Sequence, residues 1–201
     1  MKPEVVLIDF GMGNLRSVYR ALERAGAKPR VSRSADDVAR AGRVVVPGVG
    51  SCGAAMADLA ESGLDAALRE RIRAGRPYLG ICLGLQLLLE RAEEGQAECL
   101  GVIPGAVRRF PESLGLAVPH MGWNEVIAPP AHPVLRSGYF YFVHSYRATD
   151  VPAENVAATT EYGEVFPSAL QSGSCVAVQF HPEKSQREGL ALLERFLAWA
   201  P

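Results

Sequence analysis

Residues 80–84 read Gly-Ile-Cys-Leu-Gly. They overlap the end of an apolar stretch at 76–81 and are followed by a second apolar stretch at 85–90. This order predicts that a short buried strand enters a tight turn and that a helix leaves it. Glycines are required beside Cys82 because a Cβ there would clash with the neighbouring strand or helix. The pattern is a nucleophile elbow with sulfur in place of oxygen. We therefore expect a strained Cys82 at a helix N-terminus, with its sulfur acting as a nucleophile rather than packing as a small apolar group.

Size and composition predict one α/β domain over residues 1–201 with a core of its own. The chain is 48% hydrophobic and 21% charged with a formal net charge of −1, which favours neither a nucleic-acid partner nor an anionic membrane. Four cysteines without a C-x-x-C pair exclude zinc-finger and thioredoxin-like patterns. A strand-like segment opens the sequence where a signal peptide would stand, and no apolar run is long enough to span a bilayer. We expect a reduced, cytoplasmic protein with no metal or cofactor.

The first ninety residues alternate between buried strands and helices. Strands are expected at 4–10, 28–32, 43–47 and 76–81, and helices at 15–25, from Asp36, at 54–74 and from 85 to about 90. Gly11–Asn14 is expected to form a tight turn, with Asn14 capping the first helix and Gly26 ending it. This alternation predicts a parallel sheet with right-handed crossovers.

The second half of the chain is interrupted by Pro and Gly turns. Another buried strand is expected at 174–180, before a closing amphipathic helix at 187–199. Short strands are expected at 107–110, 123–127, 139–143, 156–160 and 165–170. The short, turn-separated strands favour antiparallel additions to the sheet. The predicted fold is therefore α/β, with three layers and a mostly parallel central sheet flanked by helices.

His181 is the candidate base for Cys82. It ends the predicted strand Val176-Ala-Val-Gln-Phe, and catalytic groups of a doubly wound sheet collect beyond the carboxyl ends of its strands. Glu183 follows two residues later, and the proline between them restricts the backbone. Its carboxylate is placed to accept a hydrogen bond from the imidazole and fix the tautomer. We predict a Cys82–His181–Glu183 triad.

Acyl chemistry also needs hydrogen-bond donors for the developing oxyanion. The N–H of Leu83, directly after the nucleophile, is the first candidate. The second is the segment Pro47-Gly-Val-Gly at the end of an adjacent predicted strand, where glycines allow the backbone to approach a ligand and a peptide to reorient.

Two motifs resemble the class I (triad) glutamine amidotransferases: Gly80-Ile-Cys-Leu-Gly-Leu-Gln and, about a hundred residues later, Gln179-Phe-His-Pro-Glu. The resemblance covers nearly the whole chain and implies the flavodoxin-like fold of that class. A finer resemblance, to the glutaminase subunits of imidazole glycerol phosphate synthases, rests on three segments. They are Asp9-Phe-Gly-Met-Gly-Asn-Leu-Arg-Ser-Val, Pro119-His-Met-Gly-Trp-Asn and Tyr141-Phe-Val-His-Ser-Tyr.

The resemblance implies hydrolysis of L-glutamine to glutamate and ammonia through a thioester on Cys82. It also implies that the N–H groups of Val49 and Leu83 form the oxyanion hole, the first of them after a peptide flip. The resemblance also implies that substrate glutamine is contacted by Gly50, Gln86 and the backbone of His144 and Ser145.

The resemblance further implies a heterodimer with a (β/α)8-barrel cyclase that receives ammonia through a channel. The products are imidazole glycerol phosphate and the aminoimidazole carboxamide ribotide, in histidine biosynthesis. Met121, Trp123 and Asn124 are expected near that interface, and Lys184 is a candidate interface cation.

Three alternatives remain open from the sequence. The first is a glutaminase of the same class that serves another synthase, such as one making pyridoxal phosphate or anthranilate. The second is a non-catalytic flavodoxin-like binding or regulatory module, in which Cys82 is a redox sensor or a packing residue. The third is a cysteine peptidase on a related fold.

Overall fold

The central sheet of this computed structural model, which describes residues 2–11 and 14–201, has seven strands in the order β11-β12-β13-β4-β3-β1-β2. Five of them run parallel, namely β1 (Glu4–Ile8), β2 (Lys28–Ser32), β3 (Arg43–Val46), β4 (Tyr78–Ile81) and β13 (Cys175–Val178). β12 (Val165–Ser172) and β11 (Val156–Glu161) extend the sheet antiparallel. The mostly parallel sheet with antiparallel additions is confirmed.

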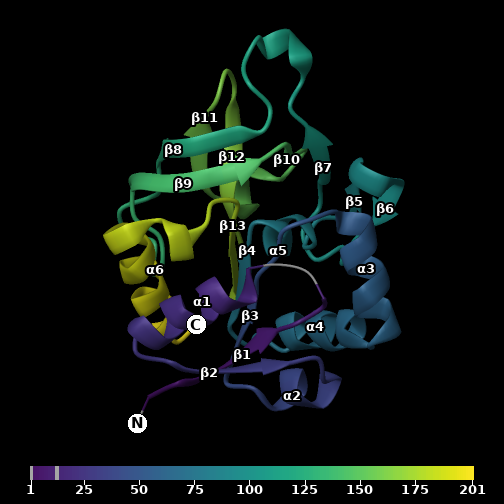
Figure 1. Ribbon diagram of the computed structural model, residues 1–201, viewed down its shortest axis with the longest axis vertical. Coiled ribbons are helices and arrows are strands. Elements are labelled where there is room, and N and C mark those ends of the chain that lie inside the picture. Colours follow the sequence, from purple (N-terminus) through teal and green to yellow (C-terminus); the bar gives the residue numbers. More distant parts are fainter. Residues whose placement is uncertain (1, 12–13) are drawn as a thin grey trace.

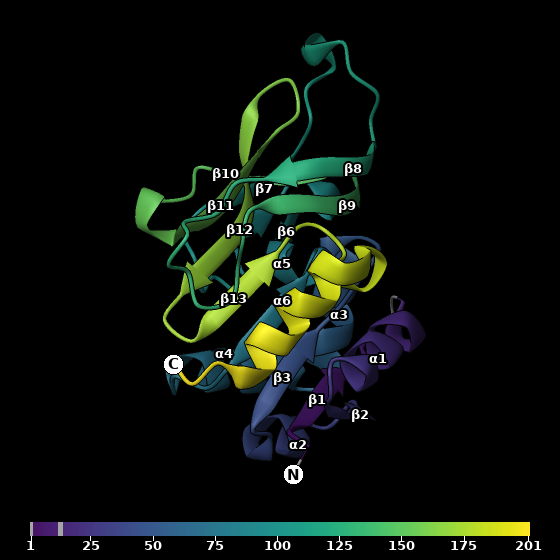
Figure 2. The same ribbon diagram turned by 90° about the vertical axis from the view of Figure 1, so that its left-hand side faces the viewer.

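Helices cover both faces of this sheet. On one face lie α1 (Leu15–Arg24) and α6 (Gln186–Ala198), and on the other α2 (Ala35–Arg40), α3 (Cys52–Glu61) and α4 (Leu64–Arg73). Figures 1 and 2 show the sheet between these two helical layers. The three-layer arrangement predicted from the sequence is therefore confirmed.

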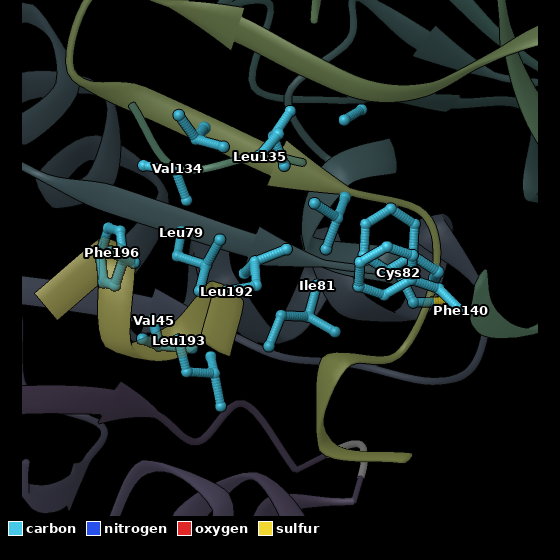
Figure 3. Packing of buried hydrophobic residues seen from close by; sticks show 14 of the residues in the cluster. Val45, Leu79, Ile81, Cys82, Val134, Leu135, Phe140, Leu192, Leu193 and Phe196 are labelled. Atoms are coloured by element: carbon cyan, nitrogen blue, oxygen red, sulfur yellow. The ribbon is translucent and has the colours of Figure 1, made fainter. Parts of the chain in front are cut away.

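Strand alternation divides the core into two clusters. Val5 and Leu7 of β1 belong to the cluster under α1 and α6, whereas Val6 and Ile8 belong to the cluster under α3 and α4. Both faces are apolar because helices cover both. Figure 3 shows Leu79 and Ile81 of β4 pointing toward α6, with Cys82 at the end of the same row. The apolar cluster on this face therefore extends up to the elbow.

Two predicted helices are wrong in length. The helix expected at 54–74 is divided into α3 and α4, because Gly63 adopts a left-handed conformation (φ 67°) at the start of α4. The helix expected from 85 to about 90 is the single turn α5 (Leu83–Gln86). The turn expected at Gly11–Asn14 includes residues 12 and 13, which lie outside the described residues.

A second, four-stranded sheet was only partly predicted. It has the order β10-β7-β5-β6 and contains β7 (Ala106–Arg109), β10 (Tyr146–Thr149), β5 (Arg91–Ala92) and β6 (Ala97–Glu98). Only β7 matches a predicted strand. Strands as short as β5 and β6 contain too few residues to show alternation, so the sequence carries no periodic signal for them. The short 3₁₀ helices of the chain are η1 (Glu94–Gln96), η2 (Glu112–Leu114), η3 (Ala153–Asn155) and η4 (Pro182–Lys184).

A two-stranded ribbon of β8 (His120–Val126) and β9 (Gly138–His144) lies over η4 and the adjoining end of α6 (Figure 1). Backbone hydrogen bonding attaches it to the candidate base, since His181 N donates to Tyr141 O at 2.9 Å. Ser185 Oγ accepts from Tyr141 N at 3.0 Å. The ribbon and the segment after β13 are therefore held as one unit. Within the described residues, no helix combines the length and apolarity needed to cross a membrane.

Candidate active site

The elbow has the strained backbone that the sequence predicts. Cys82 adopts φ 53° and ψ −101°, a conformation that costs a non-glycine residue about 1–3 kcal/mol. Both flanking glycines are required by close packing. A Cβ on Gly80 would lie 2.4 Å from the carbonyl oxygen of Gly84, and a Cβ on Gly84 would lie 2.0 Å from Val46 O. The elbow is thus clamped between β3 and β4, and Cys82 stands at the start of α5.

This packing makes Gly84→Ala strongly destabilising. The methyl group would overlap the Val46 backbone, so β3 and the elbow must separate, and we expect the free energy of unfolding to fall by about 3 kcal/mol or more. Gly42→Ala is the matched control, because its nearest atom would be Glu4 O at 3.9 Å. Urea unfolding of both variants checks the prediction. Equal stability of the two variants would show that the elbow is not clamped.

Cys82 and His181 follow neighbouring parallel strands, β4 and β13. Cys82 N donates to Val178 O at 2.7 Å, which continues the strand pairing up to the nucleophile. The structure therefore brings the first two predicted triad residues to the same edge of the sheet. His181 Nδ1 lies 2.7 Å from Glu183 Oε1, and both side chains are fully buried. The predicted geometry of the third member is also present.

The electrostatics of the site favour a protonated His181. Burial alone would lower the pKa of His181, but the neighbouring Cys82 sulfur and the Glu183 carboxylate outweigh burial and raise this pKa to about 10. Nε2 makes no hydrogen bond to any of the described residues. The imidazole therefore has one nitrogen committed to Glu183 and the other available for proton transfer near Cys82.

Asn14 does not cap α1 as expected. Its side chain makes no capping hydrogen bond, and Nδ2 instead donates to Glu183 Oε1, the oxygen that also faces His181. A buried carboxylate needs hydrogen-bond donors to remain ionised. Asn14 thus reaches across from α1 to supply the second donor to Glu183.

The predicted oxyanion donors do not converge. Leu83 N donates to Gly48 O at 3.4 Å, so the carbonyl of the Gly48–Val49 peptide faces the predicted hole. In a planar trans peptide the N–H points opposite to the carbonyl, so the Val49 N–H points away from Leu83. Gly50 adopts φ 119°, which favours glycine. The structure thus shows this segment with its peptide in the orientation that blocks the hole.

Gln86 is buried and is held by the protein itself. Its Nε2 donates to Tyr146 O and to Gln179 Oε1, both at 3.2 Å. Gln179 Nε2 in turn lies 3.5 Å from Cys82 Sγ. Gln179 belongs to the motif Gln179-Phe-His-Pro-Glu, from which no role for its side chain was predicted. The signal available was its position two residues before His181, within the strand predicted at 174–180.

The other histidines are not bases for Cys82. His144 Nδ1 faces Tyr146 O at 2.8 Å, so it carries the proton, and Nε2 accepts from His120 Nδ1 at 3.0 Å. Burial lowers the pKa of His144 to about 3 and that of His120 to about 4. His132 Nδ1 accepts from two backbone N–H groups near its own position. Only His181 remains beside the sulfur.

The backbone of the His144–Ser145 segment is fixed between β9 and β10. Ser145 O accepts from Phe110 N at 3.0 Å, and the His144 ring is buried. The carbonyl of Tyr146 accepts from both His144 Nδ1 and Gln86 Nε2. The candidate substrate residues His144 and Gln86 are thus joined through one backbone carbonyl.

The outer face of the β8–β9 ribbon carries several large exposed apolar side chains beside Glu125. Met121, Trp123 and Tyr139 are 61%, 48% and 59% exposed. Trp123 packs edge-on against Tyr141, with ring centroids 6.2 Å apart. Lys184 Nζ, directly after the candidate triad, lies 5.7 Å from the centre of the Tyr141 ring. We define the ribbon face as Met121, Trp123, Tyr139, Tyr141 and Lys184.

Asn124 lies on the opposite side of the ribbon. Its Nδ2 faces His120 Nε2 at 3.2 Å and donates to Glu161 O at 2.8 Å. Strand alternation places it with His120 rather than with Met121 and Trp123. The structure therefore brings three of the four expected interface residues together and separates Asn124 from them. Among residues 2–11 and 14–201, no group of three or more His, Cys, Asp and Glu side chains is arranged to hold a metal ion.

Comparison with known proteins agrees with this fold. The model of the family "Glutamine amidotransferase class-I" matches residues 6–199, so the chain belongs to the class I glutamine amidotransferases, a family of enzymes. The chain is 49% identical to the "Imidazole glycerol phosphate synthase subunit HisH" of Methylococcus capsulatus, covering 98% of this chain and 97% of that protein. It is 47% identical to the protein of the same name from Moorella thermoacetica, covering 98% and 94%.

Solved structures show the same fold at lower identity. One, described as a glutamine amidotransferase, has a TM-score of 0.77 at 23% identity and covers 96% of this chain and 97% of that chain. Another, a chain described as "Structure of PurLQS from Thermotoga maritima", has a TM-score of 0.78 at 20% identity, with 98% of this chain and 98% of that chain covered. These likenesses establish the flavodoxin-like amidotransferase fold expected from the motifs. Family membership also removes the non-catalytic module and the peptidase from the alternatives.

Proposed function

We propose that this chain is the glutaminase subunit of an imidazole glycerol phosphate synthase. It hydrolyses L-glutamine and passes ammonia to a (β/α)8-barrel cyclase in histidine biosynthesis. The observation that carries the proposal is the meeting of Cys82, His181 and Glu183 at one sheet edge, beside an exposed apolar face. The full-length likeness to synthase subunits supports this assignment over a glutaminase that serves another synthase.

Acylation begins at Cys82. Its sulfur attacks the side-chain amide carbon of glutamine, and the carbonyl oxygen becomes an oxyanion. The C–N bond then breaks, and protonated His181 transfers the Nε2 proton to the departing nitrogen, which leaves as ammonia. A γ-glutamyl thioester remains on Cys82. Glu183 holds the imidazole ring through Nδ1 during this transfer.

Deacylation uses the same groups in reverse. Neutral His181 takes a proton from water as the water oxygen attacks the thioester, the C–S bond breaks with its electron pair going to sulfur, and glutamate leaves. Both oxyanions need the Leu83 and Val49 N–H groups. Because the Gly48 carbonyl occupies this position, the Gly48–Val49 peptide must rotate before turnover. The resting chain is therefore nearly inactive until something turns that peptide.

The partner binds on the ribbon face. The ribbon face adjoins the segment that carries His181, because Tyr141 accepts a backbone hydrogen bond from His181 and Lys184 lies over the Tyr141 ring, so a protein docked there lies next to the site of ammonia release. A closed interface has a chemical reason, because ammonia must remain unprotonated and sheltered from water to act as a nucleophile. Free thiols at Cys52, Cys82, Cys99 and Cys175 support a cytoplasmic location.

The test is an ammonia-release assay on the purified chain, alone and with the barrel cyclase bound to its nucleotide ligand. We expect little release from the chain alone and strong stimulation by this one cyclase. The matched controls replace the cyclase with the ammonia-accepting subunits of other synthases, which make other products. Stimulation by one of them, and none by the cyclase, would assign the chain to another pathway.

A further inference from the structure

Gln179 is a fully buried amide directed at the nucleophile. It lies on the segment between β13 and His181, and its Nε2 is 3.5 Å from Cys82 Sγ. An amide buried so completely needs partners for both its oxygen and its nitrogen. The mechanism described above gives it no role, although it touches the reacting atom.

The orientation of the Gln179 amide is determined by its neighbours. Tyr146 O can only accept, so the NH₂ group of Gln86 must face it. The same NH₂ group donates to Gln179 Oε1, while Cys52 Sγ lies 3.7 Å from Gln86 Oε1 on its other side. If Gln179 were flipped, its NH₂ would oppose that of Gln86 and its oxygen would oppose the Cys82 sulfur. Gln179 Nε2 therefore faces the sulfur.

Few other ionisable groups face Cys82. His181 is the one cation beside it within the described residues, and Glu183 acts through His181. Cys52, from α3, is neutral, because the neighbouring Cys99 and its own burial both raise the pKa of its thiol. A charge on the Cys82 sulfur therefore has two sources of stabilisation, the His181 imidazolium and the Gln179 amide.

We propose that Gln179 is a catalytic residue that donates an N–H to the Cys82 thiolate, and that Gln86 is a positioning residue that keeps this N–H aimed at the sulfur. The donor holds the sulfur as an anion before attack. It acts again in deacylation, when the C–S bond breaks and the electron pair returns to sulfur. This inference rests on the proposed function of Cys82 and extends it.

The test is alkylation of Cys82 by iodoacetamide as a function of pH, followed by mass spectrometry of the Cys82 peptide. Iodoacetamide needs no glutamine pocket, so the pH midpoint reports on the thiolate itself. Gln179→Met keeps the side-chain volume and removes the donor. We expect its midpoint to rise by about one pH unit, the effect of losing one hydrogen bond to a charged group, with an unchanged rate at the high-pH plateau.

The control is Gln171→Met, which removes an amide from β12 that donates to Gly173 O. Its midpoint should equal that of the unaltered chain. A folded Gln179→Met variant with the unaltered midpoint would overturn the proposal. Gln86→Met provides a second test that leaves Gln179 in place. Its midpoint should move in the same direction by a smaller amount, and no movement would overturn the positioning role even if Gln179→Met fails to fold.

The experiment separates this inference from the proposed function. If Cys82 of the unaltered chain is not alkylated near neutral pH while a buried thiol elsewhere is, the assignment of Cys82 as the nucleophile is wrong. If Cys82 reacts, but the Gln179 and Gln86 variants have the same pH midpoint as the control, Cys82 remains the nucleophile and the donor role of Gln179 is wrong.

Discussion

Cys82→Ala should abolish glutamine-dependent synthesis by the complex and leave synthesis from added ammonia intact. In the proposed function, the alanine removes the atom that forms the thioester, whereas the cyclase reaction takes place on the partner subunit. A strained Cys82 backbone remains compatible with alanine at moderate cost. The measurement is the rate of imidazole glycerol phosphate formation with glutamine and, separately, with an ammonium salt above pH 8.

Cys175→Ala is the matched control for this variant. Cys175 lies in β13 and is as buried as the rest of the core, but it does not face the elbow. It should retain both activities. Loss of both activities in Cys82→Ala would mean that the substitution disrupts the complex. Retention of glutamine-dependent synthesis would mean that another group attacks the amide.

His181→Ala should slow glutamine hydrolysis on the order of a thousandfold or more, the scale of losing a catalytic base that also serves as the acid. The large effect follows from the proposed mechanism, in which the same Nε2 protonates the departing ammonia and later activates water. Because the pKa of His181 is raised to about 10, the ring enters the reaction protonated at neutral pH. The rate of ammonia release by the stimulated complex checks this.

Glu183→Gln is a milder variant for comparison with His181→Ala. It keeps the side-chain shape but removes the charge that raises the pKa of His181, so its loss should be smaller than that of His181→Ala. Ammonia-dependent synthesis should be normal in both variants, which verifies that the chain still docks. A loss of only about tenfold in His181→Ala would reduce His181 to a supporting role.

Much of the fold followed from short sequence patterns. The apolar runs of β1, β3 and β4, which alternate with helices, predicted a buried parallel sheet, and the elbow glycines predicted the strained turn. The position of His181 at the end of a strand placed it beside Cys82. These features were predictable because each depends on a local pattern joined to one general rule of sheet topology.

Other features depend on contacts that no local pattern encodes. Asn14 stands where a cap residue stands, yet its partner is Glu183, 169 positions away. The sequence around Gly48 does not specify which way the Gly48–Val49 peptide is oriented. Only the contact of Gly48 O with Leu83 N shows that this peptide blocks the oxyanion hole. The role of Gln179 depends on Gln86 and Tyr146 from other elements. The strands β5 and β6 are too short to show alternation.

The most direct measurement is labelling of the chain with the glutamine analogue diazo-oxo-norleucine, in complex with the barrel cyclase, followed by peptide mass spectrometry. We predict one adduct, on Cys82, which is absent from Cys82→Ala and forms slowly in His181→Ala. An unmodified Cys82 in an active complex, or an adduct on another residue, would contradict the assignment of this sulfur as the group that attacks glutamine.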